Sequence, residues 1–172
     1  MADSATSAVA KRHLVWALDA IIGGTPEASY PLIDALKSAS RDVRAQAARA
    51  LGQRAVPIAV EPLKKRLRDG ETAVRLQVVI ALGRIGHDEA IGALLPLVAD
   101  PDVYLAYSAR QALRRIGDWR AIALGLGSTD AKIRAGVLLA MEQVYDVAAV
   151  GELARFAESS QLPADERSLA IA

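Results

Sequence analysis

The sequence lacks cysteine altogether, and aromatic residues make up only 4% of its 172 residues. Without thiols, these residues cannot form a disulfide framework, a thiolate metal site, a cysteine nucleophile or a haem-attachment motif. Few aromatic residues and 35 alanines disfavour a β-sandwich or barrel and favour helices. Because 52% of the residues are hydrophobic and 24% are charged, we expect a folded core rather than disorder.

The chain also lacks an excess of either charge, since it has 21 basic and 20 acidic residues. This balance gives no general reason to expect nucleic acid or an anionic membrane as a partner. No stretch of about 18 uncharged apolar residues is present, and no apolar signal core follows Met1. We therefore expect a soluble protein without a membrane segment, cytoplasmic by default and periplasmic if the chain is a fragment of an exported protein.

The strongest positive signal is an internal repeat. Ala50, Ala81 and Ala112 recur at a constant interval of about 31 residues, and each is followed by leucine. A further copy follows the third at a slightly shorter interval, and another precedes the first at a slightly longer one. Self-similarity at a fixed period of this length is the sequence mark of a repeat architecture.

Each copy predicts a pair of helices. Pro31 and Pro62, separated by the same interval, suit the first turn of a first helix, where proline costs no hydrogen bond. Gly86 and Gly117 suit the left-handed position just after a second helix. Pro96 falls inside a predicted first helix, so we expect a kink or an irregular turn there.

Each second helix carries apolar residues at positions i, i+4, i+7 and i+8, with small alanines that permit close approach of neighbours. No copy can bury this face alone, so the copies must stack. The predicted fold is all-α, a right-handed α-solenoid of about five helix pairs forming a single domain over residues 9–172, after a frayed N-terminus at residues 1–8. The predicted units are a second helix at 9–22, repeats at 25–54, 55–86, 87–117 and 118–145, and a truncated repeat at 146–172. Because the last of these stops partway, we expect a part of a longer array or of a larger protein.

Three segments carry a family resemblance, namely residues 42–52 (DVRAQAARALG), 86–94 (GHDEAIGAL) and 117–122 (GDWRAI). They resemble HEAT repeats, and more narrowly the short bacterial class named after phycobiliprotein lyases. The segment that starts at Trp16 is also similar to HEAT segments inside large bacterial multidomain redox proteins. The resemblance implies a HEAT-like solenoid over almost the whole chain.

The resemblance further implies a structural ladder, in which an aspartate near each second helix pairs with an arginine just inside it. The matching residues are Asp42 with Arg44, Asp130 with Arg134, and Arg75 with Glu71 as its partner. Ala106 stands where the third repeat would carry the arginine, so the ladder should break there.

No constellation of residues predicts catalysis. His13 and His87 are the two histidines, and they cannot build the repeated His-Glu site of HEAT-like di-iron hydroxylases. No phosphate-binding glycine motif or Ser-His-Asp arrangement is present. We expect no catalytic residue, no metal site and no cofactor.

The predicted function is a non-enzymatic protein-binding scaffold, monomeric in isolation. The partner-binding residues share the side of the second helices opposite the core, where arginine and aromatic residues suit protein contacts. They are His13, Trp16, Gln46, Arg49, Gln53, Gln77, Arg84, Tyr104, Gln111 and Arg115. One alternative, implied by the resemblance, is a bilin lyase-like subunit, which would attach a tetrapyrrole to a phycobiliprotein. A DNA glycosylase is less favoured, because a near-neutral chain offers no basic groove.

Overall fold

The structure, a computed structural model, describes Ala10, His13, residues 29–142 and residues 144–158. These residues form helices and connecting turns, and no strand occurs among them. Trp16, the predicted N-terminal fraying at 1–8 and most of the predicted truncated repeat lie outside the described residues.

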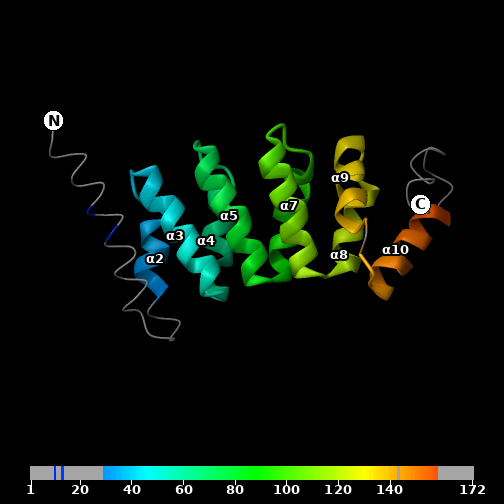
Figure 1. The fold of residues 1–172 in the computed structure, drawn as a ribbon, viewed down its shortest axis with the longest axis horizontal. Coiled ribbons are helices and arrows are strands. Elements are labelled where there is room, and N and C mark those ends of the chain that lie inside the picture. The colour runs from blue at the N-terminus through cyan, green and yellow to red at the C-terminus, as the bar shows by residue number, and fades with distance from the viewer. Residues whose placement is uncertain (1–9, 11–12, 14–28, 143, 159–172) are drawn as a thin grey trace.

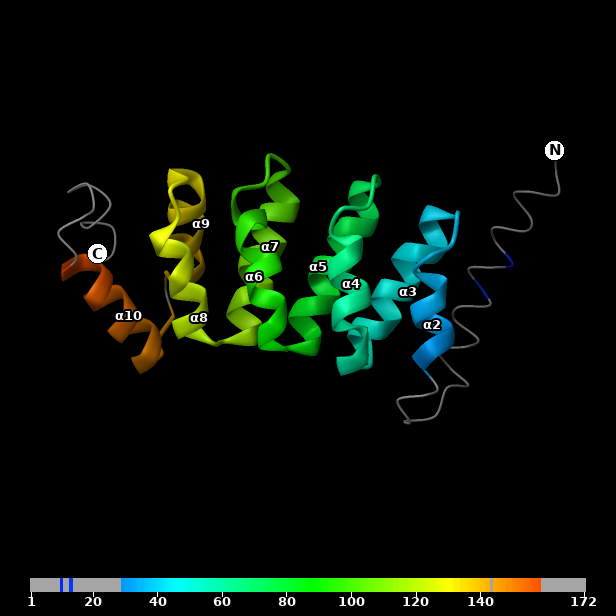
Figure 2. The same ribbon diagram turned by 180° about the vertical axis from the view of Figure 1, so that it is seen from behind.

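The helices form two layers. Figure 1 shows the second helices of the repeats side by side, and Figure 2 shows the first helices from behind. The second helices are α3 (Arg41–Gln53), α5 (Thr72–Ile85), α7 (Val103–Ile116) and α9 (Ala131–Met141). The first helices are α2 (Tyr30–Ala35), α4 (Val60–Arg66), α6 (Ile91–Leu94), α8 (Trp119–Ala123) and α10 (Val147–Glu158). Short 3₁₀ turns complete the first layer at η2 (Pro57–Ala59), η3 (Asp88–Ala90), η4 (Leu95–Ala99) and η5 (Leu124–Gly127).

Helix ends follow the local chemistry of the sequence. Gly86 and Gly117 end α5 and α7 with φ of 74° and 76°, a left-handed conformation that glycine adopts without strain. Asp102 begins α7 by accepting hydrogen bonds from the backbone N–H groups of Tyr104 and Leu105, at 2.9 and 3.2 Å. Pro96 sits where α6 gives way to η4, which confirms the irregular turn predicted for that helix.

The core lies between the two layers and follows the register of the sequence repeat. Leu51, Leu82 and Leu113 are equivalent in the three copies, and each is fully buried. The alanine before each leucine is buried as well. This repetition confirms the prediction of an all-α solenoid of stacked helix pairs, in which each pair buries its apolar face against its neighbours.

Glycine sets the spacing of the first three second helices. A Cβ placed on Gly52 would lie 2.5 Å from the Cα atom of Ala81, and one placed on Gly83 would lie 2.6 Å from the Cα atom of Ala112. Both distances are far inside a normal carbon–carbon contact of about 3.5–4.0 Å. Residues 52 and 83 therefore need to be glycine for α3, α5 and α7 to pack this closely.

Candidate functional site

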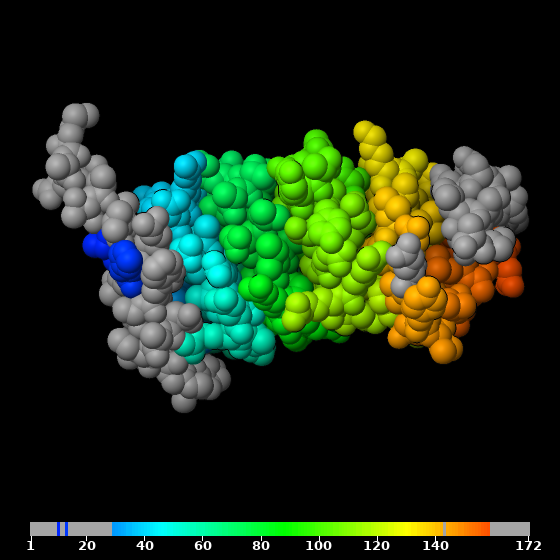
Figure 3. Space-filling model, in the orientation of Figure 1, coloured from blue at the N-terminus to red at the C-terminus, as the bar shows by residue number. Residues whose placement is uncertain are grey.

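The described residues of the predicted binding ridge, apart from His13, lie on α3, α5 and α7. These helices face the viewer in Figure 1, and Figure 3 shows the same side as a space-filling view. The exposed members of the ridge are Arg49, Gln53, Arg84, Tyr104 and Arg115, and its half-buried members are Gln46, Gln77 and Gln111. His13 is exposed, whereas Trp16 lies outside the described residues. The ridge residues described on these three helices are thus polar, apart from the exposed aromatic ring of Tyr104.

Three arginines on this ridge are available for a ligand. Arg49, Arg84 and Arg115 are exposed, and none makes an ion pair or hydrogen bond with the part of the chain that the structure describes. Arg84 and Arg115 are equivalent residues on neighbouring helices, and the equivalent position on α3 is Gln53. Arg49 lies four residues earlier on its helix, about one turn away.

The carboxylates that begin the second helices lie far from Arg84 and Arg115 along the helix axes. Asp42, Glu71, Asp102 and Asp130 all lie at the starts of second helices, where they suit the helix dipole. Arg84 and Arg115 each follow their helix's acidic residue by 13 positions, or about 20 Å along the axis. Arg84 and Arg115 are therefore the last charged residues of α5 and α7, and the exposed Asp88 and Asp118 follow them in the next turns.

Apolar side chains add to the surface on α7 and α9. Tyr104 is 75% exposed, Tyr107 is 57% exposed, and Leu139 is 48% exposed. Gly136 of α9 is buried against η4, where a Cβ would lie 2.6 Å from Val98 Cγ2. Tyr107 was missed by the sequence pattern, since its counterparts on α3 and α5 are an alanine and a leucine, which carry no polar or aromatic signal.

The predicted ladder pairs are not the pairs that form. Arg44 Nε and Nη2 donate to the two carboxylate oxygens of Asp69, each at 2.8 Å, rather than to Asp42. Asp69 precedes the next second helix, its side chain is only 3% exposed, and Arg66 Nη1 lies 3.7 Å away. The hydrogen bonds from Arg44 hold the pKa of the Asp69 carboxyl below its usual range, and the same contact raises the pKa of the Arg44 guanidinium.

The other predicted ladder residues bind backbone groups. Arg75 Nη1 donates to the carbonyl oxygen of Asp69 at 2.8 Å, and its Nη2 donates to Thr72 Oγ1 at 2.9 Å, whereas Glu71 pairs with Arg41 at 3.2 Å. The Arg75–Glu71 pair is therefore wrong. Arg75, in the first turn of α5, instead binds the loop that precedes this helix.

The predicted Asp130–Arg134 pair is also replaced by backbone contacts. Asp130 accepts a hydrogen bond from the backbone N–H of Lys132 at 2.8 Å and so caps α9. Arg134 Nη1 donates to the carbonyl oxygens of Ser128 and Thr129, at 2.8 and 3.2 Å. Arg44 makes the same contacts with the carbonyls six and five residues before it, so this loop contact is the feature that repeats.

Arg114 is a structural residue that sequence reasoning missed. Its Nε donates to the carbonyl oxygen of Ala140 at 2.7 Å, and its Nη2 donates to those of Leu139 and Glu142 at 2.7 and 2.9 Å. These carbonyls belong to the last turn of α9, which ends without a left-handed glycine. The repeat register could have revealed this residue, because Arg114 stands where the two preceding copies have Gly52 and Gly83.

No group of three or more potential metal ligands occurs among the residues that the structure describes. His87 Nδ1 lies 3.0 Å from Asp88 Oδ1 at the start of η3 and accepts from the backbone N–H of Glu89 at 3.4 Å. No helix within the described ranges is long and apolar enough to cross a membrane.

The fold and the repeat register define an α-solenoid, and the comparison with protein families names its class. The family profile described as HEAT repeats matches residues 1–72 and 60–124, which together exceed half of the chain. The chain belongs to the HEAT-repeat family, as its sequence resemblance predicted. No curated protein sequence matches the chain significantly.

Solved structures extend the likeness at the level of fold. The phycocyanin lyase complex of CpcE and CpcF from Nostoc sp. matches with a TM-score of 0.53 and 22% identity, over 93% of this chain and 64% of that chain. An engineered protein matches with a TM-score of 0.50 and 23% identity, over 93% and 52% of the two chains. Human deoxyhypusine hydroxylase, at a TM-score of 0.40 and 20% identity over 95% and 85%, is too distant to carry an argument. The chain therefore spans less than two thirds of the lyase chain and about half of the engineered one.

Proposed function

We propose that this HEAT-repeat solenoid is a non-enzymatic scaffold that binds a partner protein along its second-helix ridge. The observation that carries the proposal is the set of three exposed arginines, Arg49, Arg84 and Arg115, which have no ionic partner among the described residues. A guanidinium group binds carboxylates through two parallel hydrogen bonds, and arginine and tyrosine are enriched where protein interfaces concentrate their binding energy.

The rigid spacing of the ridge supports the same function. Because α3, α5 and α7 pack closely at Gly52 and Gly83, the helices that carry the three arginines have a fixed separation. Binding then costs less conformational entropy, because these helices need not be ordered by the partner. Neighbouring helix axes in such packing lie about 8–10 Å apart. A partner with carboxylates at a similar spacing would meet Arg84 and Arg115 together.

The test compares two variants of the full chain as bait in native lysate. The ridge variant is Arg49→Ala/Arg84→Ala/Arg115→Ala. The control variant, Lys65→Ala/Arg68→Ala/Arg120→Ala, removes the same positive charge from exposed residues of the first-helix layer. We expect quantitative mass spectrometry to find proteins retained by wild type and control but lost from the ridge variant. If the ridge variant, shown by circular dichroism to be folded, retains every partner at equal strength, the ridge is a solvated surface and the proposal fails.

A bilin lyase-like subunit is the alternative, and the likeness to the phycocyanin lyase complex supports it only through the shared fold. Its test is direct: the chain, a free bilin and a phycobiliprotein subunit are incubated together, and covalent attachment is followed by visible absorbance after denaturation. Attachment that depends on this chain would replace the scaffold proposal with a lyase function.

A further inference from the structure

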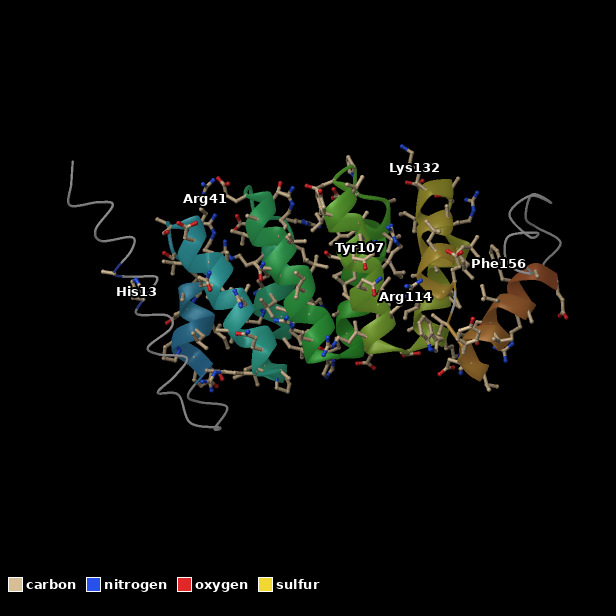
Figure 4. The ribbon with its side chains drawn as sticks, viewed as in Figure 1. His13, Arg41, Tyr107, Arg114, Lys132 and Phe156 are labelled. Carbon is tan, nitrogen blue, oxygen red and sulfur yellow. The ribbon has the colours of Figure 1, made fainter. Side chains whose placement is uncertain are left out.

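The side of α7 that faces α9 departs from the pattern of the preceding second helices. In the repeat register, Ala45 and the half-buried Leu76 are followed by the exposed Tyr107. The two glycines of the close helix contacts are followed by Arg114. Tyr107 and Arg114 are seven residues apart and therefore lie on one side of α7 (Figure 4).

These two changes have a joint structural consequence. Because α7 has no glycine at this position, α9 cannot approach α7 as closely as α7 approaches α5. The Arg114 side chain lies between α7 and α9 and binds the last carbonyl groups of α9. Leu76 packs against the core, but Tyr107, its equivalent, remains 57% exposed. A large side chain is thus left more than half exposed on the side of α7 that faces α9.

A mixed apolar and cationic surface surrounds this ring, and we name it the α7–α9 patch. On α7, its residues follow the spacing i, i+3, i+7 and i+11, which puts them on one helical face. The patch consists of Tyr104, Tyr107, Gln111 and Arg115 on α7 with Lys132 and Leu139 on α9. Figure 4 shows Lys132 at the start of α9 and Tyr107 on the neighbouring α7.

The cations of this patch are not neutralised by ion pairs. Arg115 and Lys132 form no ion pair with the described residues. The aspartates that begin α7 and α9 accept hydrogen bonds from backbone N–H groups and so serve as helix caps. Asp118, after α7, and Glu142, after α9, are further exposed carboxylates near these helices. The positive side chains are therefore free to meet a ligand.

We infer that the α7–α9 patch anchors an acidic peptide segment of the partner through one large apolar side chain. The inference rests on the proposed function and names the partner's chemistry. Arg115 and Lys132 supply two unpaired cations on the patch, which also exposes the rings of Tyr104 and Tyr107. An apolar side chain would cover the rings, and flanking carboxylates would meet the cations.

The size of the patch agrees with a short segment. Tyr104 and Arg115 are 11 residues apart on one helix, or about 16 Å. An extended peptide covers this distance with about five residues. A second copy of the chain fits poorly, because a two-fold contact would bring the same cations together. A nucleic acid fits less well than a peptide, because the chain is nearly neutral overall and offers no extended basic surface for a phosphate backbone.

The test is a selection from a phage library of random dodecapeptides on the immobilised full chain. We expect enriched peptides to carry net negative charge around a large apolar residue. The best peptide, labelled with fluorescein, should bind Tyr107→Ala at least about tenfold more weakly than wild type by fluorescence anisotropy, the loss typical of an anchoring contact. Tyr30→Ala is the matched control, because Tyr30 is 58% exposed but lies on α2, and it should leave the affinity unchanged.

Three results would overturn the inference: no enrichment above the bare support, enriched peptides that are neutral or basic, or equal binding to the two alanine variants. Tighter binding of a labelled oligothymidine strand, lost in Tyr107→Ala and falling steeply with salt, would replace the peptide by a nucleic acid. The pull-down distinguishes the two proposals. If the peptide selection fails but the ridge variant loses partners in the pull-down, the scaffold function stands and only the peptide-binding patch is refuted. If the pull-down is unchanged, the scaffold function is refuted whatever the selection gives.

Discussion

Replacing Gly83 by alanine tests the close packing of the second helices. The new methyl group would lie 2.6 Å from the Cα atom and 2.7 Å from the Cβ atom of Ala112 on α7. Because a normal carbon–carbon contact is about 3.5–4.0 Å, the two helices would have to separate by about 1 Å. No side-chain rotation can relieve the contact, since one of the two atoms it meets is backbone.

Two opposing effects set the magnitude. Alanine is favoured over glycine inside a helix by about 0.8–1.0 kcal/mol. Forcing an extra carbon into a packed interface costs about 1–3 kcal/mol, and contact with backbone puts this case toward the upper end. We therefore expect Gly83→Ala to lower the free energy of unfolding by about 1–2 kcal/mol.

Gly92→Ala is the matched control, because Gly92 lies in α6 and a Cβ there would meet nothing within 4 Å. The control should be neutral or stabilising by up to about 1 kcal/mol. Both variants are compared with wild type by urea unfolding followed by circular dichroism, with the slopes checked for a single cooperative transition. If Gly83→Ala proves as stable as Gly92→Ala, the spacing of α5 and α7 does not depend on that glycine.

Three other outcomes follow from the same structure. Leu82→Ala should cost about 2–5 kcal/mol in urea unfolding because Leu82 is fully buried, and a loss below about 0.5 kcal/mol would mean that the register is wrong. Asp69→Asn should cost about 3 kcal/mol at pH 7, since it leaves Arg44 without its buried partner. Because the folded pKa of Asp69 lies below the ordinary value of about 3.9, its contribution is complete above that value and is lost as the pH falls through the folded pKa. The stability difference between wild type and Asp69→Asn should therefore shrink as the pH is lowered below the ordinary pKa of a carboxyl, and a constant difference would contradict the ion pair. Arg114→Ala should lower stability by about 1.5–3 kcal/mol and speed amide hydrogen exchange in the last turns of α9, while unchanged exchange there would contradict its capping role.

The register of the core could be predicted from the sequence because it depends on contacts that every copy repeats. Leu51, Leu82 and Leu113 occupy the same place one repeat further along, so one period describes all three environments. Helix ends that rely on a local conformation, such as Gly86 and Gly117, could be predicted for a similar reason.

The polar contacts could not be predicted in the same way because they depend on which loop a long side chain reaches. Arg44 lies two residues from Asp42, yet residues two apart on a helix point in different directions. Its partner Asp69 is 25 residues away, in the loop that the next repeat brings alongside. The resemblance indicated the carboxylate at the start of the same helix, and only the stacked geometry identifies Asp69 as the partner of Arg44.

In the third repeat, the informative residues are those that differ from their equivalents in the two preceding copies. Where the copies agree, as at the glycines of α3 and α5, the residue serves the contact between neighbouring helices. Arg114 replaces the glycine of the other copies and instead donates hydrogen bonds to the carbonyl oxygens at the end of α9. Tyr107, two turns earlier on the same side of α7, also differs from its equivalents, and its side chain stays 57% exposed. A departure that is absorbed by a new internal contact needs no ligand, whereas the exposed Tyr107, on the same helix as the unpaired Arg115, is part of the surface proposed to bind one. This difference directs the search for a partner to α7 and α9 rather than to the more regular helices before them.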